Sequence, residues 1–508
     1  RCAGELKSPF DDIMCFYGVG NHGGGPTVEN IASIRRLDED PTLPRLVFST
    51  PDRFFAEVTA KDLPFPVVHD ELQHHASGCY AAHSGVKRWN RQAENLLSVA
   101  EKFSAVAAWV TGQPYSTEFN RAWKNVLFNQ FHDILAGTSL PAAYDDARNG
   151  YGEAMSIAAR ALNDAVQSLA WNIDIEHEQG MTPIVVFNPH SWAAKMDVEM
   201  EFGGLREGDV LLDDTGAQVP LQTVKSTVVV SGWRKRLSFV ADLPPLGYRV
   251  YRVVGQPSRL DVGPIAADDT SMENEYFSLV FEPATGAIAS LFDKQQQVDV
   301  FVSPGARAVV IDDPSDTWSH GVYQFHHVAG TFTATSLRRV EHGPVKSVIR
   351  VESAYGDSKL VQEFTMYREL PQIEVRVTVD WREQFKMLKL QFPVNLNFLR
   401  ATYEIPYGFI ERPANGEEEP GLSWVDLSGV ARGNDVPYGL SVLNDGKYSF
   451  DVQGRVISLT ALRSPIYAHH HPTQPQPGEP YEFIDQGVQR FTYTLLPHAG
   501  SWEHAGTV

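Results

Sequence analysis

The sequence predicts a multidomain α+β protein with the C-terminal part of an α/β barrel, then a three-helix bundle, then large antiparallel β-sandwich domains. Strand and helix signals alternate over residues 1–70, and apolar residues recur at helical spacing within residues 71–175. Short β-rich runs separated by turn residues fill residues 176–508. We expect this last region to form β-sandwich domains that are truncated at the C-terminus. A boundary near residue 265 would divide it into two such domains. A length of 508 residues suits about three domains.

The first segment alternates between short apolar runs and helix-start signals. Thr27 can cap one helix, and Thr50 followed by Pro51 predicts the start of another. The runs typical of strands are Ile13–Tyr17, Arg45–Ser49 and Val67-Val68. A β-α-β-α-β order indicates a parallel sheet or barrel, and three strands cannot close a barrel. We therefore expect the segment to be the end of an α/β domain whose beginning is absent from the sequence.

Three stripes of apolar residues predict three helices between about residues 85 and 171. The stripes run from Trp89 to Val110, from Phe119 to Ile134 and from Tyr144 to Leu169. Gly112 and Gly137 end the first two. Because the connections between the stripes are short, we expect the helices to be antiparallel neighbours.

The remaining residues, from about 182 onward, show no long helical pattern. Turn signals such as Asp213–Gly216 and Pro283–Gly286 separate the β-rich runs, which is typical of stacked β-sandwiches. Two segments are expected to be exposed loops: Pro406–Pro420, which contains three consecutive glutamates, and the histidine run at residues 469–471.

Composition narrows the classes of partner. The formal net charge of −20 disfavours binding to nucleic acid or to anionic lipid. No apolar run approaches the ~18 residues of a membrane-spanning helix. Three cysteines cannot form a disulfide framework, so we expect a reducing cytoplasm.

A glycine-rich loop follows the first apolar run. Gly18, Gly20 and Gly23 match G-x-G-x-x-G, the pattern of a dinucleotide-binding turn. That pattern also needs an acidic residue at the end of the next strand, and the segment Val47–Thr50 has none. Three interpretations stay open: a nucleotide-binding loop, a flexible turn, and a loop that lets a ligand approach the backbone closely.

His132 is the histidine of most interest. It lies next to Phe131 at the edge of the second stripe, near the expected end of that helix. One interpretation is a partly buried histidine hydrogen-bonded to Asp133, and the other is a metal ligand. The chain contains no His-x-x-x-His and no His-x-Asp, and one histidine alone cannot hold zinc.

Several motifs in a constant order resemble the bacterial and cytosolic-type α-mannosidases of glycoside hydrolase family 38. The motifs are Tyr17–Thr27, Glu71–Tyr80, Lys87–Arg91, Asn129–Thr138, Phe187–Trp192, Asp380-Trp381 and Met387–Pro393. They span nearly the whole chain, and their shared order is far more specific than any one of them.

The resemblance implies a zinc-dependent, retaining exo-α-mannosidase that hydrolyses terminal α-D-mannosyl residues of oligosaccharides. It implies that His132 is a zinc ligand and that Asp133 orients ligands or sugar. The nucleophilic aspartate and the other zinc ligands belong to the first part of the family's barrel, which the resemblance places outside these 508 residues. The chain alone is therefore expected to be inactive.

The glycine loop departs from the family pattern at one position. Many relatives carry aspartate where this chain has Asn21, and an amide cannot act as a general acid. The general acid is therefore left unassigned, with His22 as a catalytic candidate. We expect Asn21, Gly23 and Gly24 to contact the substrate.

Two other function classes stay open. One is a non-catalytic carbohydrate-binding protein with a mannosidase-like frame, and the other is a nucleotide-binding protein that uses the Gly18–Gly23 loop. Expected partners are α-mannosides, without nucleic acid or membrane, and the large β surface would suit a homodimer.

Overall fold

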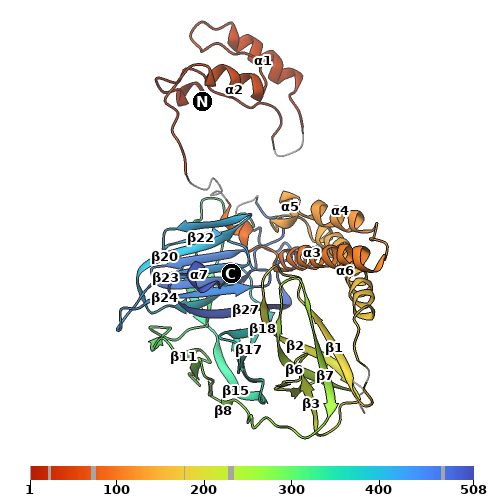
Figure 1. Cartoon of the computed structure of the whole chain (residues 1–508). Coiled ribbons are helices and arrows are strands. Elements are labelled where there is room, and N and C mark those ends of the chain that lie inside the picture. The colour runs from red at the N-terminus through yellow and green to blue at the C-terminus, as the bar shows by residue number, and fades with distance from the viewer. Residues whose placement is uncertain are drawn as a thin grey trace. The chain divides into compact units, whose positions relative to one another are not determined.

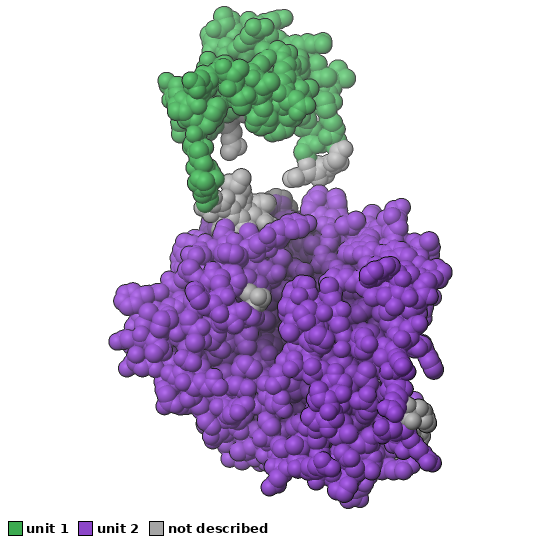
Figure 2. Space-filling view, viewed as in Figure 1, with its two compact units in different colours: residues 1–74 green, residues 75–508 purple. Residues whose placement is uncertain are grey.

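The computed structural model describes residues 2–20, 24–69, 76–176, 178–226, 234–470 and 475–507. Two compact units make up the chain, residues 1–74 (unit 1) and residues 75–508 (unit 2), which Figure 2 shows in different colours. Within the described ranges, no helix is both long enough and apolar enough to cross a membrane.

Unit 1 contains the two helices that the capping signals predict. Its elements are η1 (Cys2–Glu5), α1 (Val28–Asp38) and α2 (Pro51–Thr59). The Thr27 hydroxyl accepts a hydrogen bond from the Asn30 N–H at 3.1 Å, and the Asn30 side chain accepts one from the Thr27 N–H. The Thr50 hydroxyl accepts from the Arg53 N–H at 3.3 Å, so both predicted caps are confirmed.

The three segments of unit 1 that were expected to be strands form no β-ladder in its described part. Ile13–Tyr17, Arg45–Ser49 and Val67-Val68 have no strand partner, and Phe16 is 87% exposed. A strand needs a neighbour that pairs its backbone groups and covers one face. The strand predictions for these segments are therefore wrong for this structure, because no described segment provides that neighbour.

Unit 2 begins with helices. They are η2 (Ser77–Tyr80), α3 (Ser84–Thr111), α4 (Phe119–Asn129), α5 (His132–Leu135) and α6 (Pro141–Trp171), and the short α7 (Trp502–Ala505) follows the last strand. The long helices α3, α4 and α6 lie where the stripes predict helices (Figure 1). Their buried residues Leu97, Val126 and Tyr151 share one core. Gly112 ends α3 in the left-handed region, at a φ of 74° that suits glycine.

Two small sheets follow the helices and share a core. One sheet has the order β1 (Thr182–Phe187), β7 (Tyr248–Gly255), β3 (Asp209–Leu212), β4 (Gln218–Val219). The other has the order β2 (Ala194–Gly203), β6 (Arg234–Leu243), β5 (Gln222–Val224). Side chains from both sheets, including Leu211 and Phe239, pack together in this core.

Three larger sheets form the rest of unit 2 around a second β core. The 5-stranded sheet has the order β12 (Val298–Asp299), β11 (Ile288–Asp293), β10 (Phe277–Phe281), β9 (Ser271–Glu273), β8 (Ala266–Ala267). The 6-stranded sheet has the order β14 (Val328–Thr331), β13 (Arg307–Asp312), β19 (Lys386–Pro393), β26 (Val456–Arg463), β25 (Ser449–Gln453), β22 (Asn415–Pro420).

The 9-stranded sheet is the largest, and most of its strands can be followed in order in Figure 1. Its order is β15 (Thr333–His342), β16 (Lys346–Tyr355), β17 (Ser358–Tyr367), β18 (Ile373–Trp381), β27 (Gly487–Ala499), β24 (Pro437–Asn444), β23 (Trp424–Ala431), β20 (Leu396–Ile405), β21 (Gly408–Arg412). The ladders of the described strands are antiparallel throughout, as the turn spacing indicates.

The segment Pro406–Pro420, expected to be an exposed loop, contains the strands β21 and β22. Glu418 is only 1% exposed, and its carboxylate accepts hydrogen bonds from the Lys389 ammonium and the Ser449 hydroxyl. Asp451 lies 2.5 Å from the same ammonium. The loop prediction is wrong because a buried lysine neutralises carboxylates that would otherwise stay in water.

The histidine run at 469–471 also differs from the expected solvated loop. His469 is buried, and its N–H donates to the Thr317 hydroxyl at 3.0 Å. His470 is exposed, and its Nδ1 lies 2.7 Å from Asp316 Oδ2. His471 lies outside the described residues.

Candidate functional site

The predicted site residues fall in both units. Asn21, His22 and Gly23 lie outside the described residues. Gly24 belongs to unit 1 and is exposed, and a Cβ added there would lie 3.0 Å from Val19 Cβ. His132 lies in unit 2 beside Asp133, and these two are the predicted site residues that the structure brings together.

A break in the helix places His132 at the start of a new turn. α4 ends at Asn129, and Phe131 adopts φ −51° and ψ 140°, which is outside the helical region. The chain then forms α5, with His132 as its first residue. The expectation of one helix continuous to Ile134 is wrong, because Phe131 leaves the helical conformation before the stripe ends.

The His132 side chain points its ring into open space. It is 78% exposed, its Nε2 lies 3.5 Å from Asp133 Oδ2, and its ring centroid lies 4.2 Å from that of Phe131. The interpretation as a partly buried core histidine is therefore wrong. An exposed ion pair contributes little stability, about 0–1 kcal/mol, so this pair leaves the imidazole available to a ligand.

Hydrogen bonds from residues that follow the turn hold Asp133 in place. The Thr138 hydroxyl donates to Asp133 Oδ1 and to its carbonyl oxygen, each at 3.2 Å. The Tyr144 hydroxyl, on α6, lies 3.4 Å from the Asp133 and Ile134 carbonyl oxygens and accepts a hydrogen bond from the Ser139 N–H at 2.9 Å. These contacts hold the backbone of the turn, while the side chains of His132 and Asp133 stay in contact with solvent.

Lys87, on α3, fixes the other end of the turn. Its ammonium donates to the Leu135 carbonyl at 2.9 Å and to the Ala82 carbonyl at 2.6 Å. Burial lowers the pKa of Lys87 to about 8. Gly137 lets the turn lie directly against the backbone of Ala82, since a Cβ on residue 137 would come within 2.2 Å of the Ala82 carbonyl oxygen.

Sequence analysis did not identify Lys87 and Tyr144 as supports of the site. A signal existed for Lys87, which lies three residues before Asn90 and so on the same helix face as the buried Ala93 and Leu97. A lysine on a buried stripe needs a partner, and here the partners are backbone carbonyls. Tyr144 gave no such signal, because an aromatic residue on a stripe is ordinary core.

The described residues alone do not complete a metal site. They contain no group of three or more His, Cys, Asp or Glu side chains that could hold a metal ion. Zinc takes three or four ligands, and imidazole and carboxylate are both among its usual donors. His132 is thus suited to be one ligand, with Asp133 beside it.

Comparison with known proteins identifies the relatives of the chain. The family model "Alpha mannosidase middle domain" matches residues 74–169, and "Glycosyl hydrolases family 38 C-terminal domain" matches residues 272–477. Together these matches cover more than half of the chain.

Curated relatives align with nearly the whole chain. "Alpha-mannosidase G" of Dictyostelium discoideum is 24% identical over 535 residues, which cover 98% of this chain and 47% of that protein. "Alpha-mannosidase 2C1" of Homo sapiens is 26% identical over 515 residues, which cover 97% of this chain and 44% of that protein. The chain therefore spans about half the length of the curated relatives it matches.

A solved structure supports the fold. The crystal structure of an alpha-mannosidase from Enterococcus faecalis V583 matches 94% of this chain and 62% of its own, with a TM-score of 0.74 and 17% identity. The fold, the two family models and the aligned relatives agree, and the chain belongs to glycosyl hydrolase family 38.

Proposed function

We propose that this chain is part of a zinc-dependent, retaining exo-α-mannosidase that removes terminal α-D-mannosyl residues from oligosaccharides. Residues 1–70 would form the C-terminal part of its α/β barrel, followed by the three-helix bundle and the β-sandwich domains. The family membership and the names of the aligned relatives support this proposal.

The observation that carries the proposal is the exposed His132 on a turn with a fixed backbone. Lys87 and Tyr144 hold that backbone, so the point from which the imidazole projects is fixed before a ligand binds. Asp133 Oδ2 lies 3.5 Å from Nε2, and a hydrogen bond accepted by this carboxylate would orient the other ring nitrogen toward a metal. Preorganisation of this kind is what a metal ligand requires.

The zinc ion, when bound, would coordinate sugar hydroxyls and help to hold a distorted ring. Its other ligands and the nucleophilic aspartate would lie outside these 508 residues, since no His-x-Asp exists in the chain. Retaining hydrolysis needs two carboxyl groups about 5–5.5 Å apart, one as nucleophile and one as acid. Asn21, His22, Gly23 and Gly24 would contact the sugar.

A reducing cytoplasm is the proposed location. Cys79 is a free thiol. Free thiols persist where glutathione and thioredoxin keep cysteines reduced. The net charge of −20 favours a neutral substrate over an anionic one.

The test uses the protein that contains this chain, with His132→Ala and the matched control His190→Ala. His190 is also exposed, and it stacks on Trp192 at 4.7 Å rather than facing a carboxylate. We expect His132→Ala to lose bound zinc, measured by elemental mass spectrometry, and to lose at least ~100-fold in hydrolysis of 4-nitrophenyl α-D-mannoside. The control should keep both.

Unchanged zinc and full activity in His132→Ala would contradict the proposal. Mannose binding without turnover in the unaltered protein would instead favour the non-catalytic carbohydrate-binding alternative.

A further inference from the structure

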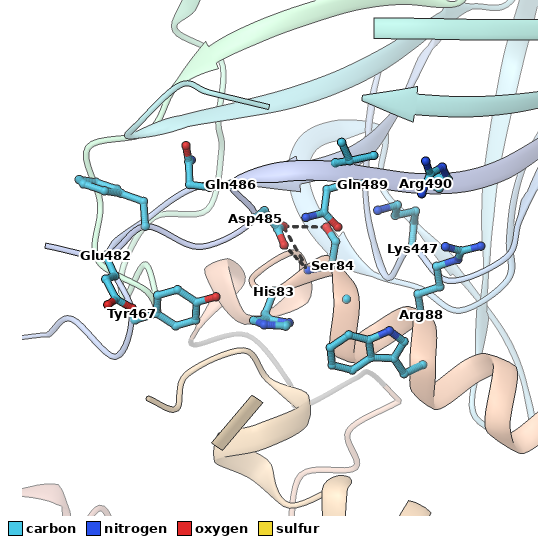
Figure 3. Close-up of a pocket in the computed structure, with 14 residues that line it drawn as sticks. His83, Ser84, Arg88, Lys447, Tyr467, Glu482, Asp485, Gln486, Gln489 and Arg490 are labelled. Atoms are coloured by element: carbon cyan, nitrogen blue, oxygen red, sulfur yellow. Dashed lines mark hydrogen bonds between the residues drawn. The ribbon is translucent and has the colours of Figure 1, made fainter. Parts of the chain in front are cut away.

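A cavity of about 600 Å³ lies in unit 2 where the start of α3 meets the segment that leads into β27. Its volume is in the range of small-molecule sites, ~300–1,000 Å³. Figure 3 shows His83 and Ser84 from the helical side facing Asp485 and Gln489 from the β side, with Gln486 also in the lining. None of these residues was singled out from the sequence.

Aromatic rings build one part of the cavity wall. His83 stacks on Tyr144 with ring centroids 3.8 Å apart, and the rings of Trp89 and Tyr467 meet His83 edge-on at 5.9 and 6.0 Å. His83, Trp89 and Tyr467 line the cavity. Packed rings of this kind give a rigid surface on which an apolar face of a ligand can lie.

His83 itself is a neutral hydrogen-bond donor. Its Nδ1 accepts a hydrogen bond from the Val86 N–H at 3.1 Å, so the ring proton is on Nε2. Burial, followed by the nearby Lys87 charge, lowers the pKa of His83 to about 3. The side chain therefore stays uncharged at neutral pH.

Asp485 is held in place as an acceptor. The Ser84 N–H donates to its Oδ1 at 2.9 Å, and the Ser84 hydroxyl donates to its Oδ2 at 2.7 Å (Figure 3). A carboxylate oxygen has room for a second hydrogen bond. Asp485 thus offers fixed acceptor positions on the β side of the cavity.

The side chains of Lys447 and Arg88, which also line the cavity, are donors without a complete set of hydrogen-bond partners. Lys447 is 4% exposed, and no hydrogen bond from its ammonium is found within the described part of the chain. Its Nζ lies 4.5 Å from the centre of the Phe491 ring. The Nε of Arg88 is buried without a hydrogen-bond partner, and the nearest carboxylate oxygen, on Asp445, is 3.9 Å away. Buried donors in this state favour a polar ligand.

The cations and carboxylates around the cavity balance one another. Lys447, Arg88 and Arg490 gather on one side in Figure 3, while Asp485 and Glu482 provide negative charge. An anionic ligand would gain from the first group and be repelled by the second. Hydroxyl groups donate and accept, so they can use both groups at once.

From this combination of aromatic wall, fixed acceptor and unpartnered donors, we infer that the cavity binds a neutral sugar. The inference deepens the proposed function and rests on it for the choice of an α-mannoside as the sugar. Tyr144 connects the cavity with the turn that carries His132. Its ring stacks on His83, and its hydroxyl lies 3.4 Å from the Asp133 carbonyl oxygen.

The test is calorimetric titration of the full 508-residue chain with methyl α-D-mannoside and, separately, with mannose 6-phosphate. We expect the neutral glycoside to bind, and the phosphate ester to bind no more tightly. Lys447→Met should weaken binding at least tenfold. Gln489→Ala, which changes a half-buried side chain on the edge of the cavity, should weaken it about threefold without a risk to folding.

Two controls separate this site from others. Arg160→Ala removes an exposed arginine on α6 and should leave binding unchanged. In the protein that contains this chain, His132→Ala should abolish zinc binding and hydrolysis under the proposed function, whereas in the 508-residue chain it should leave the binding of methyl α-D-mannoside unchanged. The two inferences can therefore fail independently.

Three outcomes would overturn the inference. The first is no binding of methyl α-D-mannoside at millimolar concentration. The second is binding that Lys447→Met and Gln489→Ala both leave unchanged, since the sugar would then lie elsewhere. The third is binding of mannose 6-phosphate alone, which would mean that the cations act as an anion site.

Discussion

Unit 1 and unit 2 carry equally clear helix signals but differ in what lies beneath the helices. α1 and α2 each begin with a threonine cap, yet Val58 is the one buried residue in the described part of unit 1. α3 in unit 2 buries a continuous stripe that includes Leu97 and Ala100. The difference teaches that a cap decides where a helix begins, whereas burial decides how strongly it is held.

Charged side chains show the same contrast. Lys61 in unit 1 is exposed and lies 2.7 Å from Asp11. Lys389 in unit 2 is buried between Glu418 and Asp451. Water screens the first pair and cannot reach the second, so removal of one partner has very different consequences in the two units.

The largest expected effect is that of Lys389→Met. It leaves two carboxylates buried without a cation and should lower the free energy of unfolding of unit 2 by about 3–5 kcal/mol. Urea denaturation followed by near-UV circular dichroism measures this. Lys386→Met on the same strand is the matched control, because Lys386 pairs with the exposed Asp312 and should cost below about 1 kcal/mol. Equal losses in the two variants would break the comparison.

The second prediction compares one leucine from each unit. Leu97 is fully buried, and Leu97→Ala should cost about 2–5 kcal/mol through lost contacts and a cavity. Leu37 is 42% exposed, and Leu37→Ala should cost at most about 0.5 kcal/mol. Denaturant midpoints of the two variants measure the difference. A large loss of unfolding free energy in Leu37→Ala would contradict this prediction, because it would mean that Leu37 is packed more closely than its exposure indicates.

The third prediction concerns alkaline pH. Burial lowers the pKa of Lys87 and Lys447 to about 8 from 10.5, so between pH 8 and 10.5 the unfolded chain binds more protons than the folded one. Stability of unit 2 should therefore rise with pH across this window, by at most about 1.4 kcal/mol per pH unit for each lysine. The Asp11 carboxylate raises the pKa of Lys61 above its usual 10.5, so this lysine stays protonated in both states and should give unit 1 no slope between about pH 8 and 10.

Denaturation at a series of pH values from 7 to 10 measures this slope. Lys447→Met should reduce the slope of unit 2 stability against pH to the part that Lys87 contributes. A slope that is unchanged in this variant would show that other groups titrate there.

The smallest expected effect is loss of a cap in unit 1. Thr50→Ala removes the acceptor of the Arg53 N–H and should destabilise α2 by about 1 kcal/mol. Hydrogen exchange of the first-turn amides of α2 measures it, with Thr59→Ala at the far end of the helix as the control. Faster exchange in both variants alike would show that the cap is not what holds the first turn.

The sequence predicts much of the fold and less of the site. The stripes place α3, α4 and α6, and the turn signals place an antiparallel β region, because both patterns are local. The exposed position of His132 was missed, since it depends on one non-helical residue, Phe131, that the apolar stripe conceals. The cavity at Ser84 and Asp485 was missed because these residues lie 401 positions apart.

Local chemistry along the chain thus decides where the elements begin and end. Thr27 and Thr50 cap helices with side chains only three residues from their partners, and Gly112 ends a helix through its own backbone freedom. The tertiary structure decides which polar groups are buried. Lys87 supports the His132 turn and Lys389 neutralises Glu418 because packing brings distant segments together, and the free energy of a charge depends on those surroundings rather than on its neighbours in sequence.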